Sequence, residues 1–289
     1  MVNLDGRVAV VTGAGDGLGK SHALLLASLG ARVIVNDLGV DRTGTGYSEQ
    51  VSDRVVEEIR GAGSEAVANY SDISEERGAQ ELVDQAIESY GRLDIVVNNA
   101  GILQDTSFKN MTVKQWDAVL KVHLQGSFLV THCAWPKLRE QNFGRVIFTT
   151  SGAGTFGNFG QANYAAAKMG IIGLMNTLAI EGRQRNILLN AVSPIASTRL
   201  TKDVMPQEQL EKLDPAYVSS AVAWLASEDC DITGEVFRVG GGDYQRLQYF
   251  VSKGVTFDHI PSVDEFADRI DEIRDMANAV LPTLALPSR

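Results

Sequence analysis

Short, almost uninterrupted runs of apolar and β-branched residues recur along this chain, and longer amphipathic stretches separate them. Strands with one wet face alternate between apolar and polar residues, whereas parallel strands that helices cover on both faces read as continuous apolar runs. The pattern therefore predicts an α/β fold, a doubly wound parallel sheet with helices on both faces. Seven strands are expected, at Val8 to Thr12, Arg32 to Asp37, Ala66 to Asn69, Asp94 to Asn98, Arg145 to Thr150, Leu188 to Val192 and Val236 to Val239.

Amphipathic stretches fill the intervals between these runs and predict the helices. The expected helices are Leu18 to Leu29, Ser48 to Ala62, Glu76 to Tyr90, Val113 to Glu140, Asn163 to Arg185 and Glu208 to Ser227.

The order of elements also predicts the domain organisation. No Pro/Gly/Ser linker interrupts it before Gly240-Gly-Gly242, so we expect one domain over residues 1–243 and a tail over residues 244–289. In the tail, Ser262 to Glu265 reads as a capping box, and apolar residues recur at helical spacing from Val263 to Met276. The tail is therefore expected to dock as one amphipathic helix.

Charge and composition narrow the function classes. The 289 residues carry 36 acidic and 26 basic side chains, a net charge of −10 that repels nucleic acid and anionic membrane surfaces. Cys133 and Cys230 alone predict no disulfide framework, and four scattered histidines predict no metal site. The N-terminal apolar run is far shorter than a signal or membrane-spanning segment, so a cytoplasmic location is expected.

The segment from Thr12 to Gly19 follows the first expected strand and opens the first helix. Glycines there let the backbone turn sharply and approach a pyrophosphate, whose charge the helix N-terminus attracts. Glycine repeats also occur in plain turns, but the strand-turn-helix context favours a dinucleotide site. The residues expected to contact the dinucleotide are Gly13, Asp16, Gly17, Leu18 and Gly19.

Asp37 ends the second expected strand, 18 residues after Gly19. A carboxylate at this position accepts hydrogen bonds from both hydroxyls of an adenosine ribose and repels a 2′-phosphate. Asp16 adds a second negative charge to the glycine loop, so NAD is the expected cofactor. The alternative is that Asp37 is only a turn residue at a strand end.

A third candidate site combines Tyr164, Lys168 and Ser151. Tyr164 and Lys168 share one helical face, and Ser151 follows a strand 13 residues upstream of the tyrosine. A tyrosine with a pKa near 10 needs a neighbouring cation to act as a base at neutral pH, and Lys168 supplies one. These side chains are therefore candidates for acid-base catalysis; the alternative is that the Tyr164 ring only fills the core.

The motifs Thr12 to Gly19, Asn98-Asn99-Ala100-Gly101 and Tyr164 to Lys168 resemble those of the short-chain dehydrogenase/reductase family, over about residues 5–243. The resemblance implies a Rossmann-like sheet with strand order 3-2-1-4-5-6-7. It also implies that Asp72 and Ile73 hold the adenine and that Asn99, Ala100 and Gly101 contact the cofactor. A homodimer or homotetramer is implied, with its interface on the helices at residues 113–140 and 163–185.

The same resemblance implies roles at the reacting centre. Tyr164 would exchange a proton with the substrate, Ser151 would hydrogen-bond the substrate oxygen, and Lys168 would hold the nicotinamide ribose. His123 stands where many members carry a catalytic Asn; it could hold the same water and titrate near pH 6.5, or it could simply pack in the helix. Thr198 is expected to contact the cofactor.

Four further segments make the resemblance closer to the dehydrogenase unit of peroxisomal multifunctional enzyme type 2, which implies a (3R)-hydroxyacyl-CoA substrate. They are residues 36–39, 68–70, 122–128 and 157–164. Basic side chains that could hold CoA phosphates, or could merely be solvated, are Arg42, Arg54, Arg199, Lys202 and Arg246.

Two other functions stay open at this stage. One is oxidation of a free 17β-hydroxysteroid or another secondary alcohol, which needs an apolar cleft without a phosphate clamp. The other is an NAD-binding sensor without turnover, against which the combination of Ser151, Tyr164 and Lys168 argues.

Overall fold

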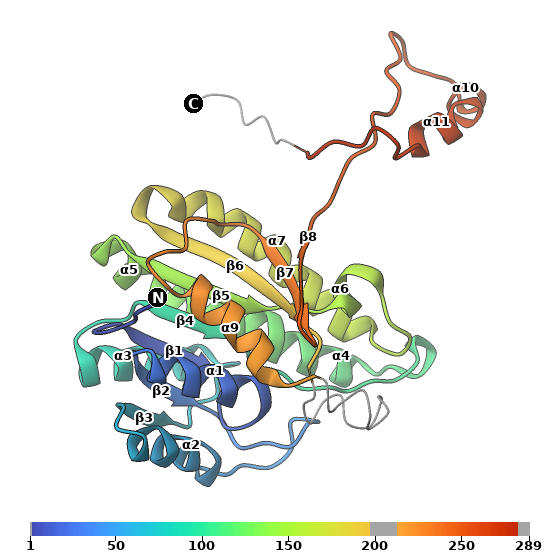
Figure 1. The fold of residues 1–289 in the computed structure, drawn as a ribbon. Coiled ribbons are helices and arrows are strands. Elements are labelled where there is room, and N and C mark those ends of the chain that lie inside the picture. Colours follow the sequence, from blue (N-terminus) through green and yellow to red (C-terminus); the bar gives the residue numbers. More distant parts are fainter. Residues whose placement is uncertain (1, 197–212, 283–289) are drawn as a thin grey trace. The chain divides into compact units, whose positions relative to one another are not determined.

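A computed structural model describes residues 2–196 and 213–282 of the chain. Its described part contains one eight-stranded sheet of order β3-β2-β1-β4-β5-β6-β7-β8, and the first seven strands run parallel (Figure 1). The expected α/β fold and strand order are confirmed. The parallel strands are β1 (Val8–Thr12), β2 (Arg32–Asn36), β3 (Ala66–Asn69), β4 (Ile95–Asn98), β5 (Gly144–Thr149), β6 (Ile187–Pro194) and β7 (Val236–Gly240).

The eighth strand, β8 (Asp243–Leu247), was missed from the sequence because it carries no apolar run. Gly241 and Gly242 connect it to β7, with φ angles of 58° and 89° that suit a tight two-residue hairpin. Strand β8 lies at the edge of the sheet and its side chains are mostly exposed. The predicted start of the tail at residue 244 therefore falls inside a strand.

Helices cover both faces of the sheet, as expected (Figure 1). One face carries α1 (Gly17–Ser28), α2 (Gln50–Gly61) and α9 (Pro215–Leu225). The other face carries α3 (Glu76–Tyr90), α4 (Val113–Leu120), α5 (Gly126–Gln141) and α7 (Ala162–Gly182). Shorter helical turns are η1 (Phe108–Asn110), α6 (Gly152–Phe156) and η3 (Arg183–Arg185).

Helix α9 begins later than the sequence predicted. Asp214 caps it by accepting a hydrogen bond from the Ala216 amide, and Pro215 occupies the first turn, where its missing N–H costs nothing. The first part of the predicted helix, residues 208–212, lies outside the described residues.

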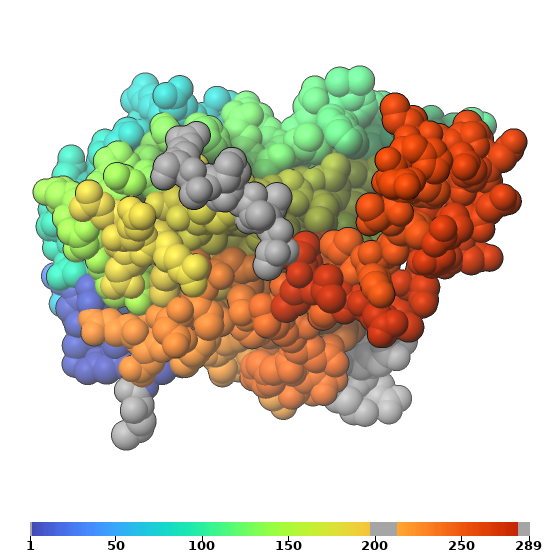
Figure 2. Space-filling view, turned by 90° about the horizontal axis from the view of Figure 1, so that it is seen from above, coloured from blue at the N-terminus to red at the C-terminus, as the bar shows by residue number. Residues whose placement is uncertain are grey.

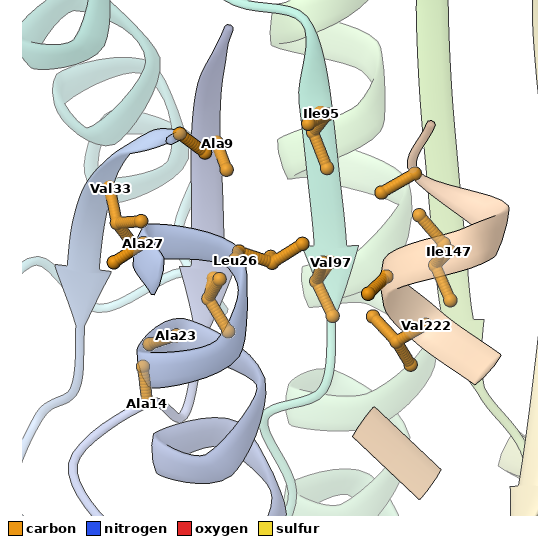
Figure 3. Close-up of a cluster of buried hydrophobic side chains, with 14 of the residues drawn as sticks. Ala9, Ala14, Ala23, Leu26, Ala27, Val33, Ile95, Val97, Ile147 and Val222 are labelled. Atoms are coloured by element: carbon orange, nitrogen blue, oxygen red, sulfur yellow. The ribbon is translucent and has the colours of Figure 1, made fainter. Parts of the chain in front are cut away.

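The core between the sheet and the helices α1 and α9 consists of small and branched apolar side chains. Figure 3 shows the Leu26 side chain of α1 on the face of the sheet, over β1 and β4, and Val222 of α9 next to Ile147 of β5. The central strands β1 and β4 are fully buried along their length, which is why their sequence reads as continuous apolar runs.

The long helix predicted over Val113 to Glu140 is wrong in one respect, because it is interrupted. A π-helical turn, η2 (Lys121–Gln125), separates α4 from α5 and has His123 at its centre. A π-turn contains one residue more than an ordinary helical turn and is common at functional sites. The hydrophobic periodicity of a sequence does not reveal this extra residue. His123 is thereby brought to the inner side of the helix, where it is buried.

The chain divides into two compact units, Met1–Arg246 and Leu247–Arg289. In the second unit, Ser262 and Glu265 form the expected capping box. The expected single helix is wrong: α10 (Val263–Asp268) and α11 (Ile270–Arg274) are two short helices, because the backbone leaves the helical region at Arg269. The domain assignment to residues 1–243 and 244–289 stays a prediction. No helix in the described ranges is long and apolar enough to cross a membrane.

Asp94 ties the amino ends of the strands together. Its carboxylate is fully buried and accepts hydrogen bonds from Arg7 Nη1 at 2.9 Å, from the Val8 amide at 3.0 Å and from two nitrogens of Arg92 at 2.6 and 2.7 Å. These contacts join the start of β1 to the start of β4, at the edge of the sheet opposite to the carboxyl ends.

We expect Asp94→Asn to lower the free energy of unfolding by about 3 kcal/mol, because it removes the charge that two arginines face in a buried place. Urea denaturation measures the change. The matched control is Asp84→Asn, on an exposed side chain of α3, which should stay within about 0.5 kcal/mol of the parent. An Asp94→Asn loss as small as that of the control would contradict this role.

Candidate functional site

A cavity of about 1140 Å³ lies in the first unit, where the carboxyl ends of the parallel strands meet. Crevices at this edge of an open α/β sheet are the usual ligand sites of such folds. The structure brings most of the predicted site residues together there. Those that line the cavity are Gly13, Asp16, Gly17, Leu18, Asp37, Asp72, Ile73, Asn99, Ala100, Gly101, His123, Ser151, Tyr164 and Lys168.

Among the described residues, one predicted site residue does not line the cavity. Gly19 is buried beneath the glycine loop: a Cβ atom there would lie 2.1 Å from the Gly13 carbonyl oxygen and 2.6 Å from the Asn99 amide nitrogen. Glycine at this position therefore lets the helix start pack against the loop. Thr198 lies outside the described residues.

The glycine loop and the segment after β4 support each other. The Thr12 hydroxyl accepts hydrogen bonds from the backbone amides of Asn99 at 3.0 Å and Ala100 at 3.1 Å. The Asn99 side chain in turn donates to the carbonyls of Thr12 and Gly13. A Cβ on Gly13, whose φ is 63°, would come within 2.7 Å of the Ala100 Cα, so only glycine fits.

This arrangement fits a dinucleotide. Gly17 begins α1, so the positive end of the helix dipole faces the cavity. Asp16 precedes the helix, and its side chain makes no capping hydrogen bond, which leaves the first amides of α1 to a ligand. A pyrophosphate would accept hydrogen bonds from those amides.

Asp37 is held in place by the backbone around it. Its Oδ2 accepts a hydrogen bond from the Gly15 amide at 2.9 Å, and its Oδ1 accepts one from the Gly39 amide at 2.7 Å. A Cβ on Gly15 would approach the same carboxylate oxygen to 2.9 Å. The carboxylate is thus fixed at the carboxyl end of β2, where it lines the cavity and keeps lone pairs for ribose hydroxyls.

A second pocket wall follows β3. Asp72 Oδ1 accepts a hydrogen bond from the Ser74 amide at 2.9 Å, which closes a tight turn that holds Ile73 against the cavity. Ile73 is buried and apolar, and Asp72 is exposed beside it. An apolar wall next to a carboxylate suits the face and the amino group of an adenine.

Ser151, Tyr164 and Lys168 approach the cavity from β5, α6 and α7. The Ser151 hydroxyl caps α6 by accepting a hydrogen bond from the Ala153 amide at 3.2 Å. Tyr164 and Lys168 lie one turn apart on α7, and the Lys168 Nζ lies 5.5 Å from the centroid of the tyrosine ring. The Lys168 Nζ also donates a hydrogen bond of 2.5 Å to the Thr149 carbonyl.

Burial sets the protonation of this group. It lowers the pKa of the Lys168 ammonium from 10.5 to about 7, because the side chain is only 3% exposed. Burial also raises the pKa of the Tyr164 phenol, although the Ser151 hydroxyl acts in the opposite direction through a hydrogen bond. At neutral pH the site therefore holds a protonated tyrosine beside a lysine that is close to the midpoint of its titration.

His123 packs edge-on against Tyr164, with the ring centroids 5.1 Å apart. Its Nε2 lies 2.8 Å from the Ile102 carbonyl oxygen and 3.1 Å from the Ile102 amide, and a Cβ on Gly101 would overlap the ring. Burial, and then the Lys168 charge, lower the pKa of the imidazole well below 6.5, so the expected titration near pH 6.5 does not fit this environment. Its Nδ1 is buried and lacks a partner among the described residues.

The basic residues at the cavity differ from those proposed for CoA phosphates. Arg54 donates to the Gln50 carbonyl, Arg246 pairs with Glu235, and neither these two nor Arg42 lines the cavity. Arg199 and Lys202 lie outside the described residues.

Two lysines that the sequence analysis missed do line the cavity. Lys114 and Lys121 lie seven residues apart on one face of the α4/η2 segment; Lys121 pairs with Glu75 at 2.5 Å, whereas Lys114 is exposed. The sequence did contain a signal for them. Lys114, Ala118 and Lys121 are spaced so that they share one face of a helix, which places the two lysines on the same side of the predicted helix.

Among residues 2–196 and 213–282, no group of three or more His, Cys, Asp and Glu side chains is arranged to hold a metal ion.

Comparison with known proteins gives a consistent set of similarities. The short chain dehydrogenase family model matches residues 7–209. A short-chain type dehydrogenase/reductase of Mycobacterium tuberculosis is 51% identical over 279 residues, which cover 96% of this chain and 98% of the relative. A hydroxyacyl-CoA dehydrogenase of the same organism is 42% identical over 254 residues, 83% of this chain and 78% of that enzyme.

The full-length structure of peroxisomal multifunctional enzyme type 2 from Drosophila melanogaster is similar to this fold, with a TM-score of 0.83 and 37% sequence identity. The similarity covers 98% of this chain and 48% of the Drosophila chain. This chain therefore spans about half the length of that enzyme, and the expected resemblance to part of it is confirmed.

We expect the affinity for NADH to fall as the pH rises through about 7, by up to about tenfold per pH unit. The ammonium of Lys168 would attract an anionic cofactor, and this charge is present below a pKa of about 7 and is lost above it. Titration of NADH fluorescence between pH 6 and 8.5 measures the affinity. The dependence should vanish in Lys168→Met and persist in His123→Asn; a dependence that instead vanishes in His123→Asn would assign the titration to the histidine.

Proposed function

This chain belongs to the short-chain dehydrogenase family, and on that premise we propose that it is an NAD-dependent oxidoreductase that interconverts a 3-hydroxyacyl-CoA and a 3-oxoacyl-CoA. The family comprises enzymes that act on CH–OH groups. One observation carries the proposal for this chain: Ser151, Tyr164 and Lys168 line the same cavity as the glycine loop and Asp37.

We assign the cofactor to the half of the cavity formed by the glycine loop, Asp37, Asp72 and the segment from Asn99 to Gly101. When bound there, a nicotinamide dinucleotide supplies the hydride acceptor for oxidation and the hydride donor for reduction. Lys168 is the buried cation on the floor of the cavity and would hold the nicotinamide ribose.

Tyr164 is the proposed acid-base group. Its raised pKa keeps the phenol protonated at neutral pH, so the hydroxyl is ready to donate a proton to a ketone oxygen during reduction. Oxidation requires the same oxygen to take the alcohol proton, which the Lys168 ammonium favours by stabilising tyrosinate. The Ser151 hydroxyl would donate a hydrogen bond to the substrate oxygen as negative charge develops on it.

His123 is proposed to position the reacting centre. Its contact with Ile102 fixes the backbone after Gly101, and its ring packs against Tyr164. If Nε2 carries the proton that Ile102 accepts, the orphaned Nδ1 is an acceptor that a water could satisfy. A neutral histidine could therefore take the place of the Asn of other family members without titrating near neutral pH.

The location of the protein in the cell and its oligomeric state do not affect the proposed chemistry. The cytoplasmic location and the homo-oligomeric state stay predictions. The outer side of α7, yellow in Figure 2, supports the second of these: Ile180 is 58% exposed on it, and Phe128 of the neighbouring α5 is exposed and stacks on His132. Such exposed apolar side chains on the two long helices suit an interface with a second copy.

We expect NAD to be preferred over NADP, because Asp37 would face a 2′-phosphate with a fixed negative charge. Asp37→Ala should narrow the preference by about 1 to 3 kcal/mol, the range of a hydrogen bond to a charged group. The ratio of kcat/KM for the two cofactors measures it. Equal or better efficiency of the parent with NADP would contradict the assignment of Asp37.

The thioester substrate is proposed from the similarity to a hydroxyacyl-CoA dehydrogenase and from the lysines at the cavity. NADH formation should be measured with 3-hydroxyacyl-CoA substrates and with free hydroxysteroids, each at low and high ionic strength. The KM of the thioester should rise with salt, whereas that of a neutral steroid should hardly change. Turnover of a free steroid without reaction of any acyl-CoA would favour the alternative function.

A matched pair of variants sharpens this test. Lys114→Ala should raise the KM of the thioester about two- to fivefold, the effect of one exposed ionic contact. Lys109→Ala removes another exposed lysine, one that does not line the cavity, and should leave the KM unchanged. Equal effects of the two substitutions would remove Lys114 from the site.

A further inference from the structure

The connection between β2 and α2 spans residues 37–49, longer than the two to about six residues usual between a strand and the following helix, and part of it lines the cavity. Residues 38–48, here called the strap, leave the sheet directly after Asp37. The Ser48 amide donates to the Leu38 carbonyl at 3.2 Å, which closes the base of the strap. Gly39, with a φ of 68°, makes this closure possible, because a Cβ there would lie 2.1 Å from the Ser48 carbonyl oxygen.

The tip of the strap is a preformed turn. Asp41 Oδ1 accepts hydrogen bonds from the Thr43 amide at 2.8 Å, from the Thr43 hydroxyl at 2.7 Å and from the Thr45 amide at 2.9 Å. The Asp41 amide donates to the Thr45 carbonyl at 2.8 Å. These bonds hold the tip in a defined turn.

The tip rests on the opposite wall of the cavity. The Leu103 amide donates to the Arg42 carbonyl at 2.8 Å, and the Gln104 side-chain amide donates to the Thr43 carbonyl at 2.9 Å. Gly44 lies against Ile102: a Cβ on Gly44 would come within 3.0 Å of the isoleucine Cδ1. The strap therefore connects the wall that carries Asp37 with the wall that carries residues 102–104.

Both partners of this contact face the cavity. Its lining includes Leu38, Val40 and the turn from Thr43 to Thr45 on the strap, and the segment from Ile102 to Gln104 opposite. A ligand whose ribose contacts Asp37 would therefore lie beside the strap. The contact between the tip of the strap and residues 102–104 would then close one side of the opening through which this ligand leaves the cavity.

We propose that the strap is a latch on the adenosine half of the bound dinucleotide, and that the contact of its tip with residues 102–104 slows cofactor release. The latch rests on the proposed function, because it requires a dinucleotide in the cavity. Residues 41–47 are exposed, and two hydrogen bonds and one small apolar contact join the tip to residues 102–104. When the strap moves away from residues 102–104, the cofactor can leave without any change in the sheet.

Gln104 also contacts the start of the helix that carries Tyr164. The Gln104 carbonyl accepts a hydrogen bond from the Asn163 side chain at 3.3 Å, and Asn163 immediately precedes Tyr164 on α7. Gln104 therefore binds the strap with its side chain and the start of α7 with its backbone. It is a positioning residue that connects the closed strap to the wall around Tyr164.

The first test measures the rate of NADH release by displacement in a stopped-flow fluorimeter. Gln104→Met keeps the length of the side chain and removes the donor to Thr43, so release should become about two- to tenfold faster, the fold-change that corresponds to one neutral hydrogen bond. The control is Gln80→Met on α3, where the side chain bonds only to Asp84 on the surface. That variant should release NADH at the parent rate.

A second pair of variants separates contact from backbone strain. Gly44→Ala and Gly46→Ala both place a Cβ on a residue with positive φ, 88° and 101° respectively. The new Cβ meets Ile102 only at position 44, since the space around Gly46 is open to 4 Å. Gly44→Ala should therefore speed release more than Gly46→Ala.

The outcomes separate the latch from the proposed function. If the parent binds and uses NADH but Gln104→Met releases it at the parent rate, or the two glycine variants behave alike, the latch is contradicted and the function stands. If the parent binds neither NADH nor NADPH, the proposed function fails and the latch fails with it. Faster release in Gln104→Met and Gly44→Ala, with unchanged release in Gln80→Met, supports the latch.

Discussion

The site depends on the close packing of two backbone segments at the carboxyl ends of β1 and β4. The Thr12 hydroxyl accepts hydrogen bonds from the backbone amides of Asn99 and Ala100, and the Asn99 side chain donates to the carbonyls of Thr12 and Gly13. The approach is possible only because Gly13 and Gly19 have no Cβ. This contact fixes the position of the glycine loop at the start of α1, where the proposed cofactor would lie.

The strand order places the chemistry around that contact. The chain leads from β1 to β2 on one side of β1 and crosses from β3 back to β4 on the other side, so a crevice opens at the carboxyl ends of β1 and β4. Asp37 reaches the crevice from β2, and Ser151 reaches it from the end of β5. Helix α7 then brings Tyr164 and Lys168 in from the other face of the sheet. Buried in this way, the lysine loses the solvation that would keep its pKa near 10.5.

Much of this could be predicted from the sequence, because buried parallel strands and glycine turns leave strong patterns. The strands β1 and β3 occur at the predicted bounds, and the predicted site residues from Gly13 to Lys168, except Gly19, line one cavity. The π-turn at His123 could not be predicted, since one extra hydrogen-bonded residue hardly changes helical periodicity. The strap could not be predicted either, because its contact with Gln104 depends on the distance between two loops in space.

We propose that Tyr164 transfers the proton in a cavity that also holds the nicotinamide cofactor. The most direct test of this proposal is the Tyr164→Phe variant, which removes the hydroxyl and keeps the ring that packs on His123. NADH binding by fluorescence titration and turnover of the best substrate should be measured on the same preparation. We expect the Tyr164→Phe variant to bind NADH with the affinity of the parent. Its turnover should be lower by at least about a hundredfold, the lower end of the range for a general acid-base group. Turnover within about tenfold of the parent would contradict it, since another group would then have to transfer the proton.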